Sequence, residues 1–481
     1  MRLLPSAWCR RWLAPWLLAP WLAGAASAQL APPSAPAVPL SLASDPAVLA
    51  RTALGAERGT LVVGVLRGDK AAYGIAHNPE PLVARAIEPA SAEQPMFEIG
   101  SVTKVFTGLL LAQAVERGDV ALDDSVGKLL AATGHAEGLP PAVAAITLKQ
   151  LVTHTGCLPV MADGVTGGAA LAEQFRSFDL PMFWAALARI RLTAAAAPCE
   201  ARYSNFGMAL LGQLLALRYG TSWGELVRAR ITEPLGMNDT VIPLGDKASR
   251  MAPPFAGDQR QRRFDMLAYA PASALRSTAA DMLAFSRAIL AGAHGPLGPA
   301  ALRLLTPLAR YQGAEIGYAV MVRGPETGRR TYFHAGVTEG YRTLWLLAPD
   351  TGEALIVLAS NQRAPLQPVM LAIGKSRYPV PTAEVPIDPK RLADYVGEFR
   401  VGSAQLLGFI VRNGRLLARE SGKAYNGLTP TGPDRFAVTA IGAQFVFRRG
   451  EGGQVNGVTL TQGGSRLEGR RVGVAAPAAQ D

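Results

Sequence analysis

The sequence predicts an α+β fold, in which a large domain builds an antiparallel sheet from both of its ends around a helical middle, followed by a small antiparallel β-barrel. Strand-like alternation occurs early, at residues 60–76, and returns at residues 331–359. Apolar residues at helical spacing dominate the stretch between these two regions. A proline-rich segment then leads into a series of short strand-like runs, which a barrel would close.

The first residues are typical of an export signal. Arginines are followed by an apolar run over residues 12–25 and by the small residues Ala26-Ser27-Ala28, which a signal peptidase cuts. We expect residues 1–28 to be a cleaved signal peptide and the mature protein to be periplasmic or secreted. An uncleaved anchor is the alternative, and the route, general secretion or twin-arginine, stays open. Residues 29–44, rich in Ala, Pro and Ser, read as a flexible leader.

Composition and charge narrow the function classes. The chain has 481 residues, of which 49% are hydrophobic and 18% charged, enough for a large core. Its net charge is +11, of which the signal segment carries +3 and the remainder +8. A basic surface of this kind is attracted to anionic cell-envelope material. We expect no nucleic-acid partner, because the best basic cluster is only Arg260, Arg262 and Arg263 in a polar loop.

Two cysteines remain after the signal segment, which contains Cys9. Cys157 and Cys199 form an even pair in a compartment expected to be oxidising. A disulfide between them and two free buried thiols are both open interpretations, because the sequence does not show whether their Cα atoms come within bridging range.

The elements of the large domain follow in order. Residues 60–66 and 71–76, joined by Gly68-Asp69, predict a β-hairpin. A long apolar helix begins at Ser101 and ends at Gly118. Three further helices are predicted. One covers residues 208–219, the next begins at a capping box of Ser222 and Glu225, and the third runs from a second capping box, Thr278 and Asp281, to Leu290. Strands return at residues 331–335, 341–347 and 353–359.

The predicted boundaries place the large domain at residues 45–375. Prolines at 379, 381 and 386 without an apolar period predict a linker at residues 376–388. The small barrel is predicted at residues 389–475. Its strand-like runs are residues 395–399, 404–411, 415–419, 436–439, 444–448 and 457–462.

One motif combines a nucleophile with its activator. Ser101-Val102-Thr103-Lys104 matches S-x-x-K, in which the hydroxyl and the amine share one helix face and the helix N-terminus favours a developing oxyanion. Ser125-Val126-Gly127-Lys128 also matches, but it follows two aspartates and looks like a helix N-cap. Gly220-Thr221-Ser222-Trp223-Gly224 matches G-x-S-x-G, which requires a preceding strand where this sequence predicts a helix.

Two later motifs follow in order. Tyr203-Ser204-Asn205 precedes a predicted helix, and His334-Ala335-Gly336 ends a predicted strand. With S-x-x-K, they are similar in order and spacing to the three motifs of the class C β-lactamase family, which includes penicillin-binding DD-peptidases and esterases. The resemblance covers residues 45–375 and implies the β-lactamase/DD-peptidase fold. The block after the linker resembles the lipocalin-like barrels appended to some of these enzymes.

The resemblance implies a role for each residue. Ser101 would be the nucleophile, Lys104 and Tyr203 would move its proton, and Asn205 would hold Lys104 and a substrate amide or ester. His334, Gly336 and Val337 would bind substrate, with the backbone N–H groups of Ser101 and Val337 as the oxyanion hole. Lysine and tyrosine start near pKa 10, so either needs a depression of about three units to act as a base at neutral pH.

The motifs favour a serine hydrolase that forms an acyl-enzyme with small esters, amides or D-residue peptides. A DD-carboxypeptidase or weak β-lactamase is the alternative within the same chemistry, and a non-catalytic envelope-binding protein the alternative outside it. His334 stands where penicillin-hydrolysing relatives have lysine, which favours the esterase and D-peptidase branch. Gly156-Cys157 replaces the usual Ser-Gly, and Cys199 is a candidate partner that would tether this loop.

We expect neither a cofactor nor a metal. None of the five histidines is paired with another ligand at metal-binding spacing, and no phosphate loop is present. His154 is interpreted as a structural residue outside catalysis. Expected partners are therefore a small-molecule or peptide substrate, with membrane contact only through an uncleaved signal segment.

Overall fold

The computed structural model describes residues 44–473 with several gaps. The signal peptide and nearly all of the leader predicted above lie outside the described residues, as does most of the linker. The gaps are residues 79–84, 88–94, 166–170, 193–198, 312–313, 325–329, 367–368, 370–384, 386, 402–404, 413, 421–425, 439–442 and 463–464.

A nine-stranded sheet forms the centre of the large domain, in the order β3-β2-β1-β13-β12-β11-β10-β9-β8. The early strand β1 (Gly59–Arg67) pairs antiparallel with the late strand β13 (Glu353–Ala359), with Val63 opposite Val357. This pairing confirms the predicted sheet built from both ends. The others are β2 (Lys70–Asn78), β3 (Arg85–Ile87), β8 (Ala309–Tyr311), β9 (Ala314–Ile316), β10 (Met321–Arg323), β11 (Thr331–Val337) and β12 (Arg342–Ala348).

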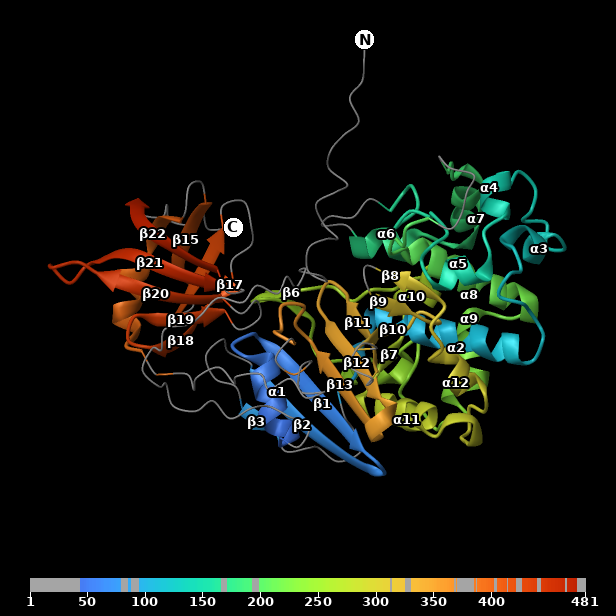
Figure 1. Cartoon of the computed structure of the whole chain (residues 1–481), viewed down its shortest axis with the longest axis horizontal. Coiled ribbons are helices and arrows are strands. Elements are labelled where there is room, and N and C mark those ends of the chain that lie inside the picture. The colour runs from blue at the N-terminus through green and yellow to red at the C-terminus, as the bar shows by residue number, and fades with distance from the viewer. Residues whose placement is uncertain are drawn as a thin grey trace, which may run out of the picture.

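Helices cover both faces of this sheet. On one face, α1 (Pro46–Leu54) buries its leucines and alanines against β1 and β13 (Figure 1). Gly74 permits this approach, because a Cβ there would lie 2.1 Å from the Pro46 carbonyl carbon. On the other face lies α11 (Ala279–Leu290), whose N-cap Thr278 accepts from the Asp281 N–H as predicted.

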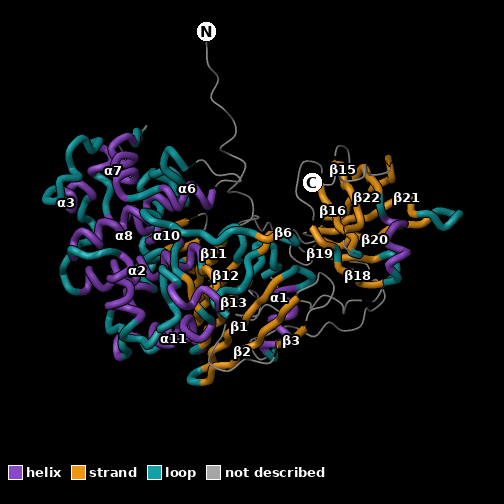
Figure 2. Tube along the Cα trace, turned by 180° about the vertical axis from the view of Figure 1, so that it is seen from behind, coloured by secondary structure: helices purple, strands orange, loops and turns teal. Residues whose placement is uncertain are grey.

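The helical middle gathers at the end of the molecule opposite the barrel, with the sheet between them (Figures 1 and 2). Its centre is α2 (Thr103–Glu116), buried along nearly its whole length, beside α8 (Asn205–Tyr219). The remaining described α-helices are α3 (Val126–Leu130), α4 (Pro141–Ala144), α5 (Leu148–Val152), α6 (Leu171–Ser177), α7 (Leu180–Arg189), α9 (Trp223–Val227), α10 (Ala270–Ser273) and α12 (Ala300–Leu304).

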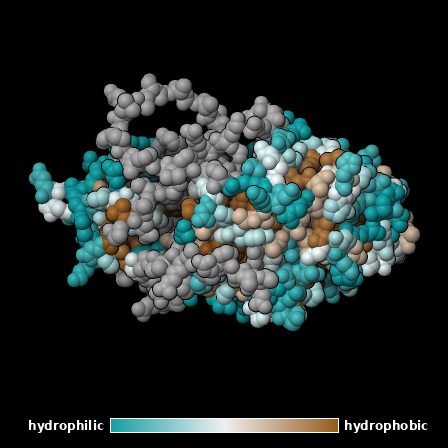
Figure 3. All heavy atoms as spheres, turned by 90° about the horizontal axis from the view of Figure 1, so that it is seen from below, coloured by the Kyte–Doolittle hydropathy of each residue, from teal (hydrophilic) through white to brown (hydrophobic). Residues whose placement is uncertain are grey.

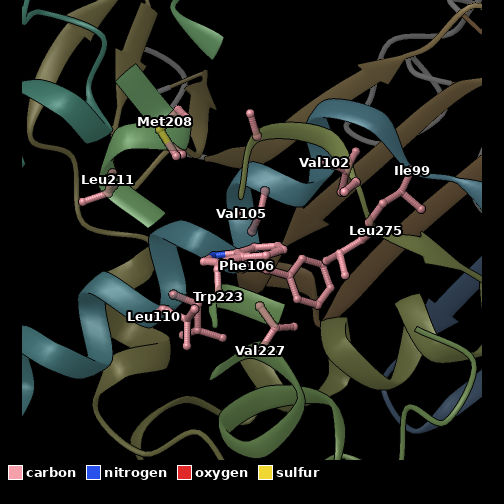
Figure 4. Packing of buried hydrophobic residues seen from close by; sticks show 14 of the residues in the cluster. Ile99, Val102, Val105, Phe106, Leu110, Met208, Leu211, Trp223, Val227 and Leu275 are labelled. Atoms are coloured by element: carbon pink, nitrogen blue, oxygen red, sulfur yellow. The ribbon is translucent and has the colours of Figure 1, made fainter. Parts of the chain in front are cut away.

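The packing around α2 fixes where its N-terminus lies. Phe106 of α2 packs among apolar side chains from distant segments, including Trp223 and Leu275 (Figure 4). Its ring also stacks on Phe285 of α11, with centroids 4.3 Å apart. A helix held on all sides by a dry core cannot shift without opening cavities. The residues at its start, Ser101 and Lys104, therefore have a rigid support.

A second nine-stranded antiparallel sheet curls into a nearly closed barrel (Figure 1). Buried aromatic rings, among them Phe399, Phe409 and Phe447, fill its interior. Its elements are η8 (Pro389–Tyr395), β14 (Gly397–Val401), β15 (Gln405–Arg412), β16 (Arg415–Glu420), β17 (Asn426–Gly427), β18 (Thr429–Gly432), β19 (Arg435–Val438), β20 (Ala443–Arg449), β21 (Val455–Gln462) and β22 (Ser465–Gly473). The polar, arginine-rich β22 was not predicted, because its sequence lacks alternation.

The described surface mixes hydrophilic and hydrophobic areas, as one face of the molecule shows (Figure 3). Arg260, Arg262 and Arg263, the basic cluster noted in the sequence, are exposed. Within the described part of the chain, no helix has both the length and the apolar character needed to cross a bilayer.

Candidate active site

Ser101 lies in a tight turn between a short strand and the buried helix. The turn is a 3-10 segment, η2 (Gly100–Val102), which continues into α2. Gly100 has a φ of +51°, and a Cβ there would lie 3.0 Å from the Val337 nitrogen. The turn also packs on the neighbouring strand, where a Cβ at Gly336 would lie 2.1 Å from the Ile99 oxygen. These two glycines let the nucleophile approach the end of β11.

Lys104 is completely buried beneath the nucleophile. Its Nζ lies 2.8 Å from both Asn205 Oδ1 and the Ala272 carbonyl oxygen, and 3.0 Å from Ser101 Oγ. The two shorter contacts are with oxygens that only accept, so they take two N–H groups of the amine. Burial lowers the pKa of Lys104 well below its usual range. In its neutral form, Lys104 would direct its lone pair at the Ser101 hydroxyl.

Tyr203, in the segment just before α8, contacts the same hydroxyl. Its phenol donates to Ser101 Oγ over 2.6 Å. Burial raises the pKa of Tyr203, although the hydrogen bond to Ser101 opposes this effect. In the resting site the Tyr203 phenol is therefore protonated and donates to Ser101, which leaves Lys104 as the candidate base for the attack by Ser101.

Asn205 is the first residue of α8 and is held by the cap of that helix. The Ser204 hydroxyl accepts from the Gly207 N–H at 2.8 Å and donates to the Pro159 carbonyl at 2.6 Å. Asn205 Oδ1 accepts the hydrogen bond from Lys104 Nζ. The structure thus brings Ser101, Lys104, Tyr203 and Asn205 together in one cluster.

The end of β11 supplies the opposite wall. Strand β10 pairs with β11 only as far as Phe333, so the edge at residues 334–337 is left beside the Ser101 turn. Backbone N–H groups at such an edge stabilise a developing oxyanion. The Val337 side chain is 55% exposed, which leaves this wall accessible. The position suits the oxyanion hole expected from Ser101 and Val337.

His334 is in the same strand but its ring points into the protein. The ring is 2% exposed, and Nδ1 lies 2.7 Å from the Ala335 carbonyl, which requires the proton on Nδ1. Burial lowers the pKa of His334 to about 3. The imidazole is neutral at neutral pH and carries no cation for a substrate carboxylate. Nε2 is buried as well, with no hydrogen-bond partner in the described part of the chain.

The segment that carries Tyr203 is tied to the loop after α5. Cys157 and Cys199 form a disulfide with Cα atoms 5.5 Å apart, within the usual range. Backbone bonds reinforce the tie, because the Cys199 N–H donates to the Thr155 carbonyl and the Arg202 N–H to that of His154. Of the two alternatives left open by the sequence, the structure contains the disulfide.

The described residues contain no group of three His, Cys, Asp or Glu placed to hold a metal ion. The Ala272 carbonyl could not be predicted from the sequence as a partner of Lys104, since any residue type supplies a backbone oxygen. The contact between the His154 and Tyr203 rings, 4.8 Å apart, has no local sequence pattern either.

A buried carboxyl below the site makes stability depend on pH. Burial raises the pKa of Glu98 to about 7, although Arg276 at 4.0 Å opposes this effect. The unfolded carboxyl titrates near 4.3, so the folded state holds the extra proton between about pH 4.3 and 7, and stability falls as pH rises through that window. From pH 5 to pH 8, the wild type should lose roughly 2 to 3 kcal/mol relative to Glu98→Gln.

Urea unfolding of both proteins at pH 5, 6, 7 and 8 measures this difference. The exposed Glu137→Gln substitution is the matched control and should follow the wild type. Parallel curves for wild type and Glu98→Gln would show that Glu98 is ionised in the folded protein throughout this range.

Comparison with known proteins gives a family match. Residues 57–372 match the family model described as Beta-lactamase. A curated relative is the D-alanyl-D-alanine-carboxypeptidase/endopeptidase AmpH of Escherichia coli K12, 34% identical over 157 residues. This match covers 32% of the chain and only 38% of the AmpH length.

Solved structures share the fold. A class C β-lactamase from Rhodobacter sphaeroides aligns over 67% of this chain and 98% of its own, with a TM-score of 0.54 and 21% identity. SurE aligns over 89% of this chain and 98% of its own, with a TM-score of 0.53 and 23% identity. The likeness to SurE therefore extends beyond the large domain. At these identities the comparisons show the fold alone.

Proposed function

The chain belongs to the β-lactamase family, and on that premise we propose that it is an exported serine hydrolase acting through a Ser101 acyl-enzyme on small esters, amides or D-residue peptides. The observation that carries the proposal is the convergence of two proton-handling groups on one hydroxyl. Lys104 Nζ lies 3.0 Å and Tyr203 Oη 2.6 Å from Ser101 Oγ. A protein that only binds its partner has no need of this arrangement.

In acylation, Lys104 accepts a proton and Tyr203 donates one. Neutral Lys104 accepts the Ser101 proton as Oγ attacks the substrate carbonyl, and N–H groups of Ser101 and Val337 stabilise the oxyanion. Tyr203 then donates its proton to the leaving nitrogen or oxygen, and the acyl-enzyme forms. A phenolate beside the Lys104 ammonium results, and the two charges stabilise each other.

Deacylation follows from microscopic reversibility. The Tyr203 phenolate accepts a proton from water, which attacks the acyl carbonyl, and the Lys104 ammonium returns its proton to Ser101 Oγ as the ester breaks. All protons are restored, and the product is a carboxylic acid. General-base help of this kind contributes about 10²–10⁴-fold in rate, and one oxyanion donor about 10²–10³-fold.

The neutral His334 favours substrates without a carboxylate at this position. A β-lactam or a free C-terminal carboxylate gains most from a cation at this position, and the buried imidazole supplies none. Neutral esters and amides have no such requirement. The similarity to AmpH supports D-residue peptides among the substrates, and a DD-carboxypeptidase or weak β-lactamase is the second candidate on that ground.

Two covalent probes test the proposal on the mature protein. A fluorophosphonate should label the protein, and peptide mapping should find the adduct on Ser101. A fluorescent penicillin should label it weakly; strong, stable penicillin labelling would favour the DD-carboxypeptidase alternative. A fluorophosphonate adduct on Ser125 or Ser222, or no adduct at all, would overturn the assignment of Ser101.

A further inference from the structure

His154 occupies an unusual place in the loop behind Tyr203. The residue follows α5 and adopts a left-handed backbone conformation, with a φ of +61°, although it is not a glycine. Its side chain is buried, and 3% of the residue is exposed. Such a conformation costs about 1–3 kcal/mol for a non-glycine residue and persists where the surrounding structure requires it.

His154 contacts Tyr203 and the residues on either side of it in the chain. Its ring lies against the Tyr203 ring, with centroids 4.8 Å apart and planes at 41°. Its Nδ1 accepts from the Ser204 N–H at 3.3 Å, and its carbonyl oxygen accepts from the Arg202 N–H at 2.9 Å. One residue therefore contacts the phenol itself and both of its chain neighbours.

We propose that His154 is a positioning residue that holds the Tyr203 phenol at proton-transfer distance from Ser101. The proposal rests on the role of Tyr203 as proton donor to the leaving group. Misplacing a reacting group by about 1 Å can cost 10²-fold in rate. On its apolar side, Tyr203 packs against a small cluster of Ala201, Tyr311 and Ile316.

The position requires a neutral imidazole. Burial lowers the pKa of His154 well below its usual range. A protonated ring would turn Nδ1 from acceptor into donor and break the bond from the Ser204 N–H. The imidazole thus combines an acceptor on one edge with an aromatic face.

Two substitutions separate the contribution of the His154 hydrogen-bond acceptor from that of its ring. His154→Asn keeps a side-chain acceptor and tolerates a positive φ, but it removes the ring. His154→Phe keeps a ring but removes the acceptor. Exposed His135 provides the matched control, His135→Asn, which should behave as the wild type.

The leaving group distinguishes a positioning role from general damage. A p-nitrophenyl ester departs without a proton, whereas the alkyl amide of the same acid needs one from Tyr203. We expect His154→Asn and His154→Phe to lower kcat for the amide about ten- to a hundred-fold, with KM within threefold. The burst rate of p-nitrophenol release, which reports acylation by the ester, should fall less than threefold. Equal losses on both substrates, or none, would overturn the proposal.

The Tyr203→Phe variant distinguishes a failure of the proton-donor role of Tyr203 from a failure of the positioning role of His154. This variant should show the same selective loss on the amide, and a larger one. If it slows acylation by both substrates equally, the proton-donor role of Tyr203 is wrong. If Tyr203→Phe is selective and both His154 variants, folded by circular dichroism, match the wild type, Tyr203 keeps its role and His154 has none.

Discussion

The Ser101→Ala variant is expected to lose hydrolysis almost completely, with kcat about 10⁶-fold below the wild type on the best ester substrate. Without the hydroxyl no acyl-enzyme forms, and Lys104 and Tyr203 have no atom on which to act together. Residual turnover would come from the oxyanion site and substrate binding alone. Steady-state kinetics and fluorophosphonate labelling measure the loss.

Ser125→Ala is the matched control, because Ser125 also begins an S-x-x-K sequence. The structure makes it the N-cap of α3, where its hydroxyl accepts from the Lys128 N–H at 3.2 Å. This variant should lose about 0.5–2 kcal/mol of stability and keep its kcat. Activity retained by Ser101→Ala, or lost in Ser125→Ala, would move the nucleophile elsewhere.

Replacing Lys104 by methionine should lower kcat/KM about 10²–10⁴-fold, the usual contribution of a general base. Methionine has a similar length and suits a fully buried position, so the variant should fold, and thermal unfolding checks that it does. Binding should change little, because the amine lies beneath the nucleophile and contacts Asn205 and Ala272. Pre-steady-state acylation rates isolate the affected step.

The second S-x-x-K again provides the control. Lys128 is exposed and forms an ion pair with Asp124 on the surface, so Lys128→Met should leave kcat/KM within twofold. An acylation rate in Lys104→Met within tenfold of the wild type would exclude the amine as the base. Tyr203 would then have to act as a phenolate, against the effect of its burial.

Local patterns predicted much of the large domain. The hairpin of β1 and β2, the caps at Ser222 and Thr278, and the strands β11 to β13 appear as expected, since each is specified by a few neighbouring residues. Strands β8, β9 and β10 did not, because each is only three residues long and gains its partners from the sheet. In the barrel, six strands lie where the sequence predicted them, namely β14, β15, β16, β19, β20 and β21. Strands β17, β18 and β22 were not predicted, because their sequences show little alternation.

The sequence by itself determined which residues could react: the S-x-x-K turn, the two later motifs, and the pair of cysteines. Only the tertiary structure decided what each does, because it brings Ala272, 168 positions beyond Lys104, onto the amine, and lays His154 against Tyr203. Proton affinity and side-chain position depend on burial and on neighbours, and neighbours so distant along the chain leave no local pattern by which they could be recognised.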